Sequence, residues 1–248
     1  MSEKTIVAMW SGPRNISTAM MRAFENRGDT AVWDEPFYAH YLATTGLDHP
    51  MREAVIDAGE TDAQAVIDRC RTVPTAPNRQ GRTPDIWFQK HMTMHMQPGI
   101  PLDWMAGARN FFLIRRPEAV LASYHDRRAD PVAADVGFER QAELFEIATR
   151  LQGAPPPVID SETVLEAPER TLRALCEALA IPFDPAMLAW PPGMRDDDGV
   201  WAAHWYKSVE TSQGFAKPGP PRPLPARLAS LAEECRPYYE ALAAHALR

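Results

Sequence analysis

The sequence predicts an α/β fold, in which a mostly parallel central sheet carries helices on both faces and so makes three layers. Short apolar runs alternate along the chain with segments of helical character, and this order is typical of a parallel sheet. Several of the runs end in charged or polar side chains, and ligands of such folds bind beyond the carboxyl ends of the strands. The 248 residues are 45% hydrophobic and 24% charged, a balance that allows a substantial core.

The order of elements can be followed from the N-terminus. Five apolar runs predict strands at residues 6–10, 30–33, 86–89, 110–114 and 156–160. Between and after them, helices are expected at 15–27, twice within 50–72, from Pro117 onward, and over 136–151, 169–179 and 226–247. A polar, proline-rich link at 74–84 precedes the third strand. Polar side chains that follow these strands, such as Arg14, Glu35, Lys90 and Arg115, should gather at one edge of the sheet.

The loop after the first strand has the composition of an anion site. It reads Ser11-Gly12-Pro13-Arg14-Asn15-Ile16-Ser17-Thr18 and runs directly into a helical pattern. A strand–loop–helix junction aims backbone N–H groups and the positive end of the helix dipole at one point. Arg14 adds a charge, and Ser17 and Thr18 add hydroxyl donors. The loop lacks the Gly-Lys-Ser/Thr ending of a nucleotide triphosphatase loop. We therefore expect it to bind a phosphate or sulfate group by means of its backbone N–H groups, Arg14 and the two hydroxyl groups.

A second strand-to-helix junction carries another basic residue. The apolar run 110–114 is followed by Arg115 and Arg116, and Pro117 suits the first position of a helix. Ser123 lies eight residues after Arg115, on the helix that follows.

Together these two segments resemble the 5′-phosphosulfate loop and the 3′-phosphate motif of the sulfotransferase superfamily, which uses 3′-phosphoadenosine 5′-phosphosulfate (PAPS). The resemblance implies a P-loop NTPase-like sulfotransferase fold and transfer of a sulfuryl group from PAPS to a hydroxyl or amine of a small molecule, with no metal. It extends through residues 158–183, with an acidic-polar link expected at 161–164 before the helix, and Ala180 stands at a position usually held by glycine. The resemblance implies cofactor contacts from Gly12, Pro13, Arg14, Asn15, Ser17, Thr18, Arg115 and Ser123.

Candidates for the chemistry follow the second and third strands. An acidic residue at the place of Glu35 resembles the general base of some bacterial and protein-tyrosine sulfotransferases, and burial would raise its pKa toward neutrality. Cytosolic members carry a lysine and a catalytic histidine at the end of the third strand, with one residue between them. Here Lys90 and His91 are adjacent, so His91 stays an alternative base. Arg14 and Lys90 would stabilise the departing phosphate, and His95 is expected to be structural.

The C-terminal third provides weaker candidates. The segment 204–215 is similar in type to the basic loop that covers the cofactor in this family, which makes Lys207, Ser208 and Ser212 possible contacts. The acidic triplet 196–198 lacks the other ligands of a calcium loop and is expected to be a solvated turn. The whole chain, 1–248, is then one domain. Helical insertions at 36–85 and 125–140 would face the substrate, the proline-rich segment 190–225 would cover the cofactor, and 226–248 would be a C-terminal helix.

Composition narrows the function classes further. A net charge of −7 argues against general nucleic-acid binding. Three scattered cysteines indicate neither a disulfide framework nor a zinc site. An N-terminus without an apolar leader, and no apolar run of membrane-spanning length, predict a cytoplasmic protein without membrane contact. Two alternatives have the same architecture, namely a P-loop kinase acting on a small metabolite and a non-catalytic nucleotide-binding protein. The acceptor and the oligomeric state are open.

Overall fold

The computed structural model describes residues 4–125, 130–220 and 222–247, apart from the side chain of Ser208. Within this part of the chain, five strands form one parallel sheet in the order β2-β3-β1-β4-β5. The strands are β1 (Thr5–Ser11), β2 (Thr30–Asp34), β3 (Ile86–Met92), β4 (Arg109–Ile114) and β5 (Val158–Asp160). All five predicted strands and the α/β fold class are therefore confirmed.

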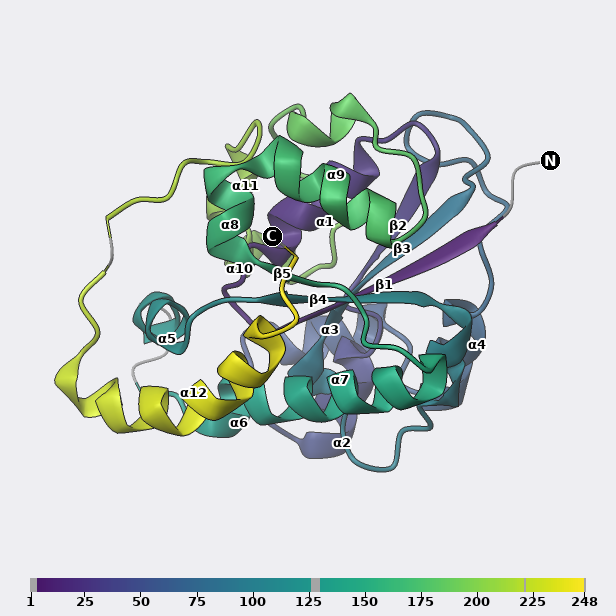
Figure 1. The fold of residues 1–248 in the computed structure, drawn as a ribbon. Helices are drawn as coiled ribbons and strands as arrows, with labels where there is room; N and C mark the ends of the chain where they lie inside the picture. Colours follow the sequence, from purple (N-terminus) through teal and green to yellow (C-terminus); the bar gives the residue numbers. More distant parts are fainter. Residues whose placement is uncertain (1–3, 126–129, 221, 248) are drawn as a thin grey trace.

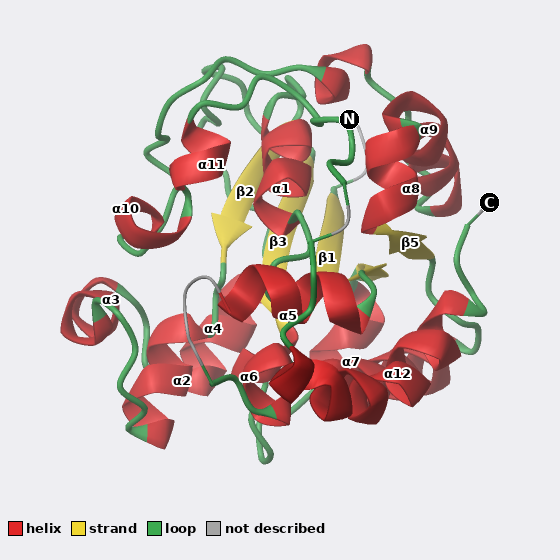
Figure 2. Ribbon diagram, turned by 90° about the vertical axis from the view of Figure 1, so that its left-hand side faces the viewer, coloured by secondary structure: helices red, strands yellow, loops and turns green. Residues whose placement is uncertain are grey.

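Helices cover both faces of the sheet and complete the three predicted layers (Figure 1). One face carries α1 (Ser17–Glu25), α8 (Ser161–Glu166) and α9 (Pro168–Ala178), with the short α10 (Ala202–Trp205) and α11 (Lys207–Glu210) nearby. The other face carries α4 (Ala63–Cys70), α7 (Phe138–Gln152) and α12 (Ala229–Ala243), so that the strands lie between the two sets in Figure 2.

The remaining helices are short, and most belong to the segments that follow β2, β3 and β4. They are α2 (Tyr38–Thr45), α3 (Arg52–Ala58), α5 (Pro117–His125), α6 (Ala133–Val136) and the short 3₁₀ helices η1 (Thr93–His95), η2 (Asp103–Gly107), η3 (Pro185–Leu188) and η4 (Ala226–Leu228). No described helix is long and apolar enough to cross a bilayer.

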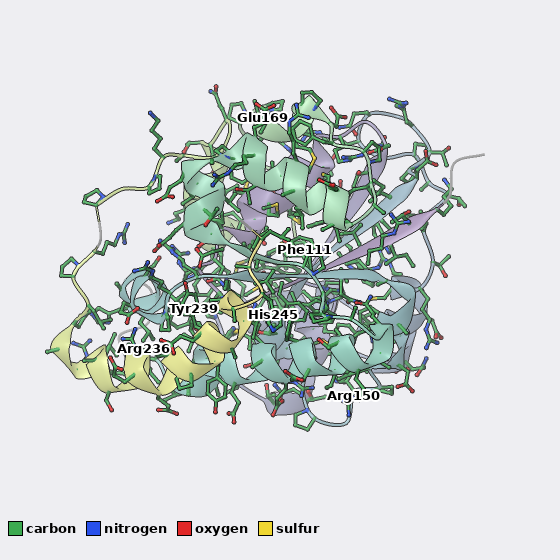
Figure 3. The ribbon with its side chains drawn as sticks, viewed as in Figure 1. Phe111, Arg150, Glu169, Arg236, Tyr239 and His245 are labelled. Carbon is green, nitrogen blue, oxygen red and sulfur yellow. The ribbon has the colours of Figure 1, made fainter. Side chains whose placement is uncertain are left out.

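Strand periodicity divides the core into two halves. On β1, Val7 and Met9 pack toward α1 and α9, whereas Ala8 and Trp10 pack toward α4 and α7. This alternation is the two-residue repeat of a strand. Phe111 on β4 is fully buried inside the molecule, while Arg150 on α7 and Glu169 on α9 lie on opposite outer surfaces (Figure 3).

The C-terminal helix is anchored at the end of β5. Tyr239 on α12 donates a hydrogen bond to Asp160 Oδ2 at 2.9 Å (Figure 3). Beyond the helix, the backbone N–H of Leu247 donates to the carbonyl of Val158 at 2.8 Å. These contacts join the end of the described chain to the edge strand.

Three local expectations need correction. The stretch 161–164, expected as a link, is the start of α8, because the Asp160 side chain accepts from Glu162 N at 2.7 Å and caps the helix. Helix α2 was not predicted as an element of its own. The acidic triplet is not simply solvated, since Asp198 is buried in an ion pair with Arg22 at 2.6 Å. The residue that replaces the usual glycine, Ala180, has a φ of 50°.

Candidate active site

The two predicted anion motifs, about a hundred residues apart in sequence, are in direct contact. Arg14 Nε donates to Ser123 Oγ at 2.9 Å, and Arg115 donates to the carbonyl of Arg14 at 2.7 Å. Asn15 Nδ2 donates to the carbonyl of Leu113 at 3.1 Å, which fixes the loop to the end of β4. The loop after β1, the end of β4 and the second half of α5 therefore form one continuous surface.

This surface borders a cavity of about 240 Å³ at the carboxyl ends of the strands. Three of its lining residues, Arg14, Ile16 and Glu35, have φ values of 62°, 59° and 44°. Non-glycine residues rarely adopt this left-handed conformation, and such strain concentrates at functional sites. The backbone around the cavity is thus held in unusual conformations at three points.

The cavity end near α1 has the features of an anion site. Helix α1 begins after Ile16 with no side-chain cap, so its first N–H groups are not used by a capping side chain. Among the described residues, the buried Arg115 Nε has no hydrogen-bond partner. Burial lowers the pKa of Arg115, and Glu162 and Asp160 offset this only in part. A bound phosphate or sulfate would supply the missing acceptor and negative charge. Nine predicted site residues line the cavity: Pro13, Arg14, Asn15, Ser17, Thr18, Glu35, Lys90, Arg115 and Ser123.

On the side of β2 and β3, Lys90 is the centre of a buried polar network. Its Nζ donates to Asp34 Oδ1 at 2.7 Å, to Glu35 Oε1 at 2.5 Å and to the Tyr206 hydroxyl at 2.7 Å. That hydroxyl donates in turn to Asp34 Oδ2 at 2.6 Å. An ammonium group has three donors, and all three of Lys90 are engaged. Lys90 therefore lies at the cavity as predicted, but it is bonded to carboxylates instead of being available to a leaving phosphate.

The network determines the charge of Glu35. Burial raises the pKa of Glu35, Lys90 lowers it and Asp34 raises it, which leaves the pKa at about 7 instead of its ordinary value of 4.5. Although burial lowers the pKa of Lys90, Asp34 and Glu35 raise it well above its ordinary value. Lys90 is thus a permanent cation, and Glu35 is a carboxyl group that changes charge near neutral pH. A general base needs a pKa in this range.

His91, the alternative base, lies on the opposite face of the sheet. Neighbouring strand residues point to opposite faces, and β3 continues to Met92, so His91 points away from Lys90. Its ring stacks on Trp10 at 4.4 Å between centroids. Burial lowers the pKa of His91 to about 3. The expectation that His91 acts as the base is therefore wrong for this structure.

Other predicted contacts lie away from the cavity. Gly12 permits close packing, because a Cβ there would come within 2.9 Å of the Val136 carbonyl. Lys207 is exposed, and the Ser212 hydroxyl donates to the carbonyl of Val209 at 2.7 Å; neither lines the cavity. The side chain of Ser208 is outside the described part of the chain. From the same C-terminal segment, Tyr206 lines the cavity instead, and its sequence position gave no signal of this.

Sequence comparison finds matches that cover almost the whole chain. A family model described as sulfotransferase domain matches residues 4–246. Two Arabidopsis thaliana proteins, named branched-chain-amino-acid aminotransferase-like proteins 1 and 2, are 35% and 32% identical over 99% and 97% of this chain. The matches cover 43% and 42% of those proteins, so the chain spans less than half the length of these curated relatives.

Solved structures share the fold at low sequence identity. A sulfotransferase from Alicyclobacillus acidocaldarius is similar over 100% of this chain and 98% of that one, with a TM-score of 0.53 and 12% identity. A sulfotransferase domain from the curacin biosynthetic pathway is similar over 95% of this chain and 99% of that one, with a TM-score of 0.51 and 17% identity.

Proposed function

Because the chain belongs to the sulfotransferase domain family, we propose that it transfers a sulfuryl group from PAPS to a hydroxyl group of a small molecule. The observation that carries the proposal is the contact between the two anion motifs. Arg14, Ser123 and Arg115 are joined by hydrogen bonds at one end of a cavity whose other side contains Glu35. An anion-binding surface and a carboxyl group with a pKa near neutrality thus border the same space.

Each part of the cavity then has a role in binding the donor. The start of α1, with Ser17, Thr18 and Arg14, would hold the 5′-phosphosulfate. Arg115 and Ser123 would hold the 3′-phosphate, to which Arg115 Nε offers a charge-assisted hydrogen bond. PAPS supplies the sulfuryl group and a phosphate that leaves with the bonding electrons of the sulfur–oxygen bond.

We assign Glu35 as the general base that accepts the proton of the acceptor hydroxyl. In its ionised form it takes the proton of the acceptor hydroxyl as the acceptor oxygen bonds to sulfur and the bond from sulfur to the phosphate oxygen breaks. The products are a sulfate ester and 3′-phosphoadenosine 5′-phosphate (PAP). Lys90 keeps part of the Glu35 population ionised near neutral pH, since it opposes the effect of burial. Arg14, which lines the donor end of the cavity, would stabilise charge on the leaving phosphate.

The proposal is tested by the nucleotide preference of the purified chain. Calorimetric titration without magnesium should show that PAP binds at least about tenfold more tightly than AMP, since a charge-assisted hydrogen bond contributes about 1.5–3 kcal/mol. Incubation with PAPS and small hydroxyl compounds should then release PAP. Equal affinity for PAP and AMP, or a preference for ATP with magnesium, would contradict the proposal and favour the kinase alternative.

A further inference from the structure

On the acceptor side of the cavity, Glu35 and His95 face each other across a distance that one oxygen atom can bridge. His95 Nδ1 lies 4.0 Å from Glu35 Oε2, which is too long for a direct hydrogen bond. A hydroxyl oxygen about 2.8 Å from each atom would fit this separation. His95 is only 2% exposed, and its Nδ1 has no hydrogen-bond partner among the described residues. A buried polar atom that lines a cavity without a partner indicates a ligand contact.

The His95 ring is held firmly in this position. It stacks on Tyr38 at 4.5 Å with an interplanar angle of 8°, and on Tyr41 at 4.8 Å. The Tyr38 hydroxyl is in turn hydrogen-bonded to His49 Nδ1 at 2.9 Å. Burial and the neighbouring His49, Lys90 and His91 lower the pKa of His95 well below its ordinary value. His95 is therefore a neutral, fixed hydrogen-bonding group.

The charges around this position disfavour an anionic acceptor. Three of the described lining residues are permanent cations, and two of them, Arg14 and Arg115, lie at the donor end with Ser123. Lys90 has all three donors engaged by Asp34, Glu35 and Tyr206. A carboxylate on the acceptor would thus lie beside Asp34 and Glu35, whose lysine partner is fully engaged. The remaining wall is largely apolar and aromatic, formed by Tyr38, Met92, Met94, Tyr124 and Trp205. Glu35 is the only acidic side chain among the described lining residues, so an ammonium group on the acceptor body would lie against this apolar wall without a carboxylate partner.

We propose that the acceptor is an uncharged hydroxyl compound with an apolar body, whose hydroxyl group lies between Glu35 and His95; the inference rests on the proposed sulfuryl transfer. The hydroxyl donates its hydrogen to Glu35 and accepts from His95 Nδ1–H, which leaves a lone pair to bond to sulfur. An ammonium group has no lone pair for this purpose. His95 is therefore an acceptor-binding residue, and Glu35 alone receives the proton.

A matched series of phenols tests the acceptor class. The probes are 4-ethylphenol, 4-hydroxyphenylacetate and tyramine, which share the reacting hydroxyl and have similar size but are neutral, anionic and cationic. With PAPS as donor, kcat/KM for 4-ethylphenol should exceed that for either charged probe by at least about tenfold, since an unpaired buried charge is costly. Calorimetric binding of 4-ethylphenol to the PAP-loaded protein should show the same preference, independently of turnover.

The matched pair of variants is His95→Phe and His91→Phe, because both histidines are fully buried but only His95 lines the cavity. His95→Phe keeps a stacking ring and should lower kcat/KM for 4-ethylphenol by about 10- to 100-fold with unchanged PAP affinity. His91→Phe should leave kcat/KM within about threefold. Preference for a charged phenol, or an unaffected His95→Phe enzyme, would overturn the inference while the PAP-binding function stands. Failure of the wild-type protein to bind PAP would contradict both the proposed sulfuryl transfer and the acceptor inference.

Discussion

The charge of Glu35 links catalysis and stability, and a single substitution, Glu35→Gln, tests both. Burial beside Lys90 and Asp34 gives this carboxyl group a pKa of about 7 in the folded protein, against an ordinary value of 4.5. Below the lower value, both folded and unfolded chains are protonated, so the group has no effect on the unfolding free energy. As the pH rises, the unfolded chain ionises first, and the folded state loses stability until the folded pKa is passed.

The size of this effect follows from the two pKa values. Each unit of pKa difference corresponds to about 1.4 kcal/mol, so the wild-type unfolding free energy should lose about 2 kcal/mol through Glu35 between about pH 5 and about pH 7.5. Glu35→Gln should remove this part of the pH dependence. Denaturant unfolding of both proteins at the two pH values measures the difference. The exposed Glu166→Gln, at the end of α8, is the matched control and should keep the wild-type pH dependence.

The same variant has a kinetic consequence. Loss of a general base lowers kcat by about 100- to 10,000-fold, whereas PAP affinity should stay within about twofold. Wild-type kcat/KM should rise with pH through about 7 and then level, because the ionised form is the active one. A Glu35→Gln protein that retains wild-type kcat, or that unfolds with the wild-type pH dependence, would refute the assignment of Glu35 as a base with a pKa near neutrality.

Two further substitutions test the scaffold. Ala180→Gly should raise the unfolding free energy by about 0.5–1 kcal/mol, because residue 180 has a φ of 50°. The control Ala174→Gly, inside α9, should lower it by about 1 kcal/mol. If thermal unfolding showed that both substitutions change the stability in the same direction, the strain at Ala180 would be contradicted. Asp198→Ala should lower the unfolding free energy by up to about 3–5 kcal/mol, since it breaks a buried ion pair and leaves Arg22 with Glu25 alone. Asp196→Ala, at an exposed position, should lower the unfolding free energy by less than about 0.5 kcal/mol. If denaturant titrations gave similar losses for Asp198→Ala and Asp196→Ala, burial of the ion pair would be unimportant.

The strands could be predicted because buried parallel strands appear as short apolar runs, whatever surrounds them. Asn110–Ile114 is an example, and it falls within β4. Short helices were harder. Helix α8 depends on Asp160 as a cap in a sequence that also suits a loop. Helix α2 has only eight residues and follows Glu35, whose left-handed backbone has no signature in the sequence.

The site was predictable where a motif fixes local geometry, and not where distant segments meet. The loop around Arg14 and the strand-to-helix junction that carries Arg115 and Ser123 are local patterns, and the structure brings both to one cavity. Whether His91 could reach the site together with Lys90, as an alternative base to Glu35, depended on where β3 ends. With the strand extended to Met92, neighbouring residues must point to opposite faces. Tyr206 reaches Asp34 across 172 positions of sequence, and such a contact leaves no pattern to read.

Binding of the 3′-phosphate by Arg115, at the donor end of the cavity, is tested most directly by comparing Arg115→Ala with Arg116→Ala. The second residue is the matched control, because Arg116 is 65% exposed and pairs with Glu162. In calorimetric titrations, the preference for PAP over AMP should fall by about 10- to 100-fold in Arg115→Ala and persist in Arg116→Ala. An Arg115→Ala protein that still prefers PAP as strongly as the wild type would contradict the account.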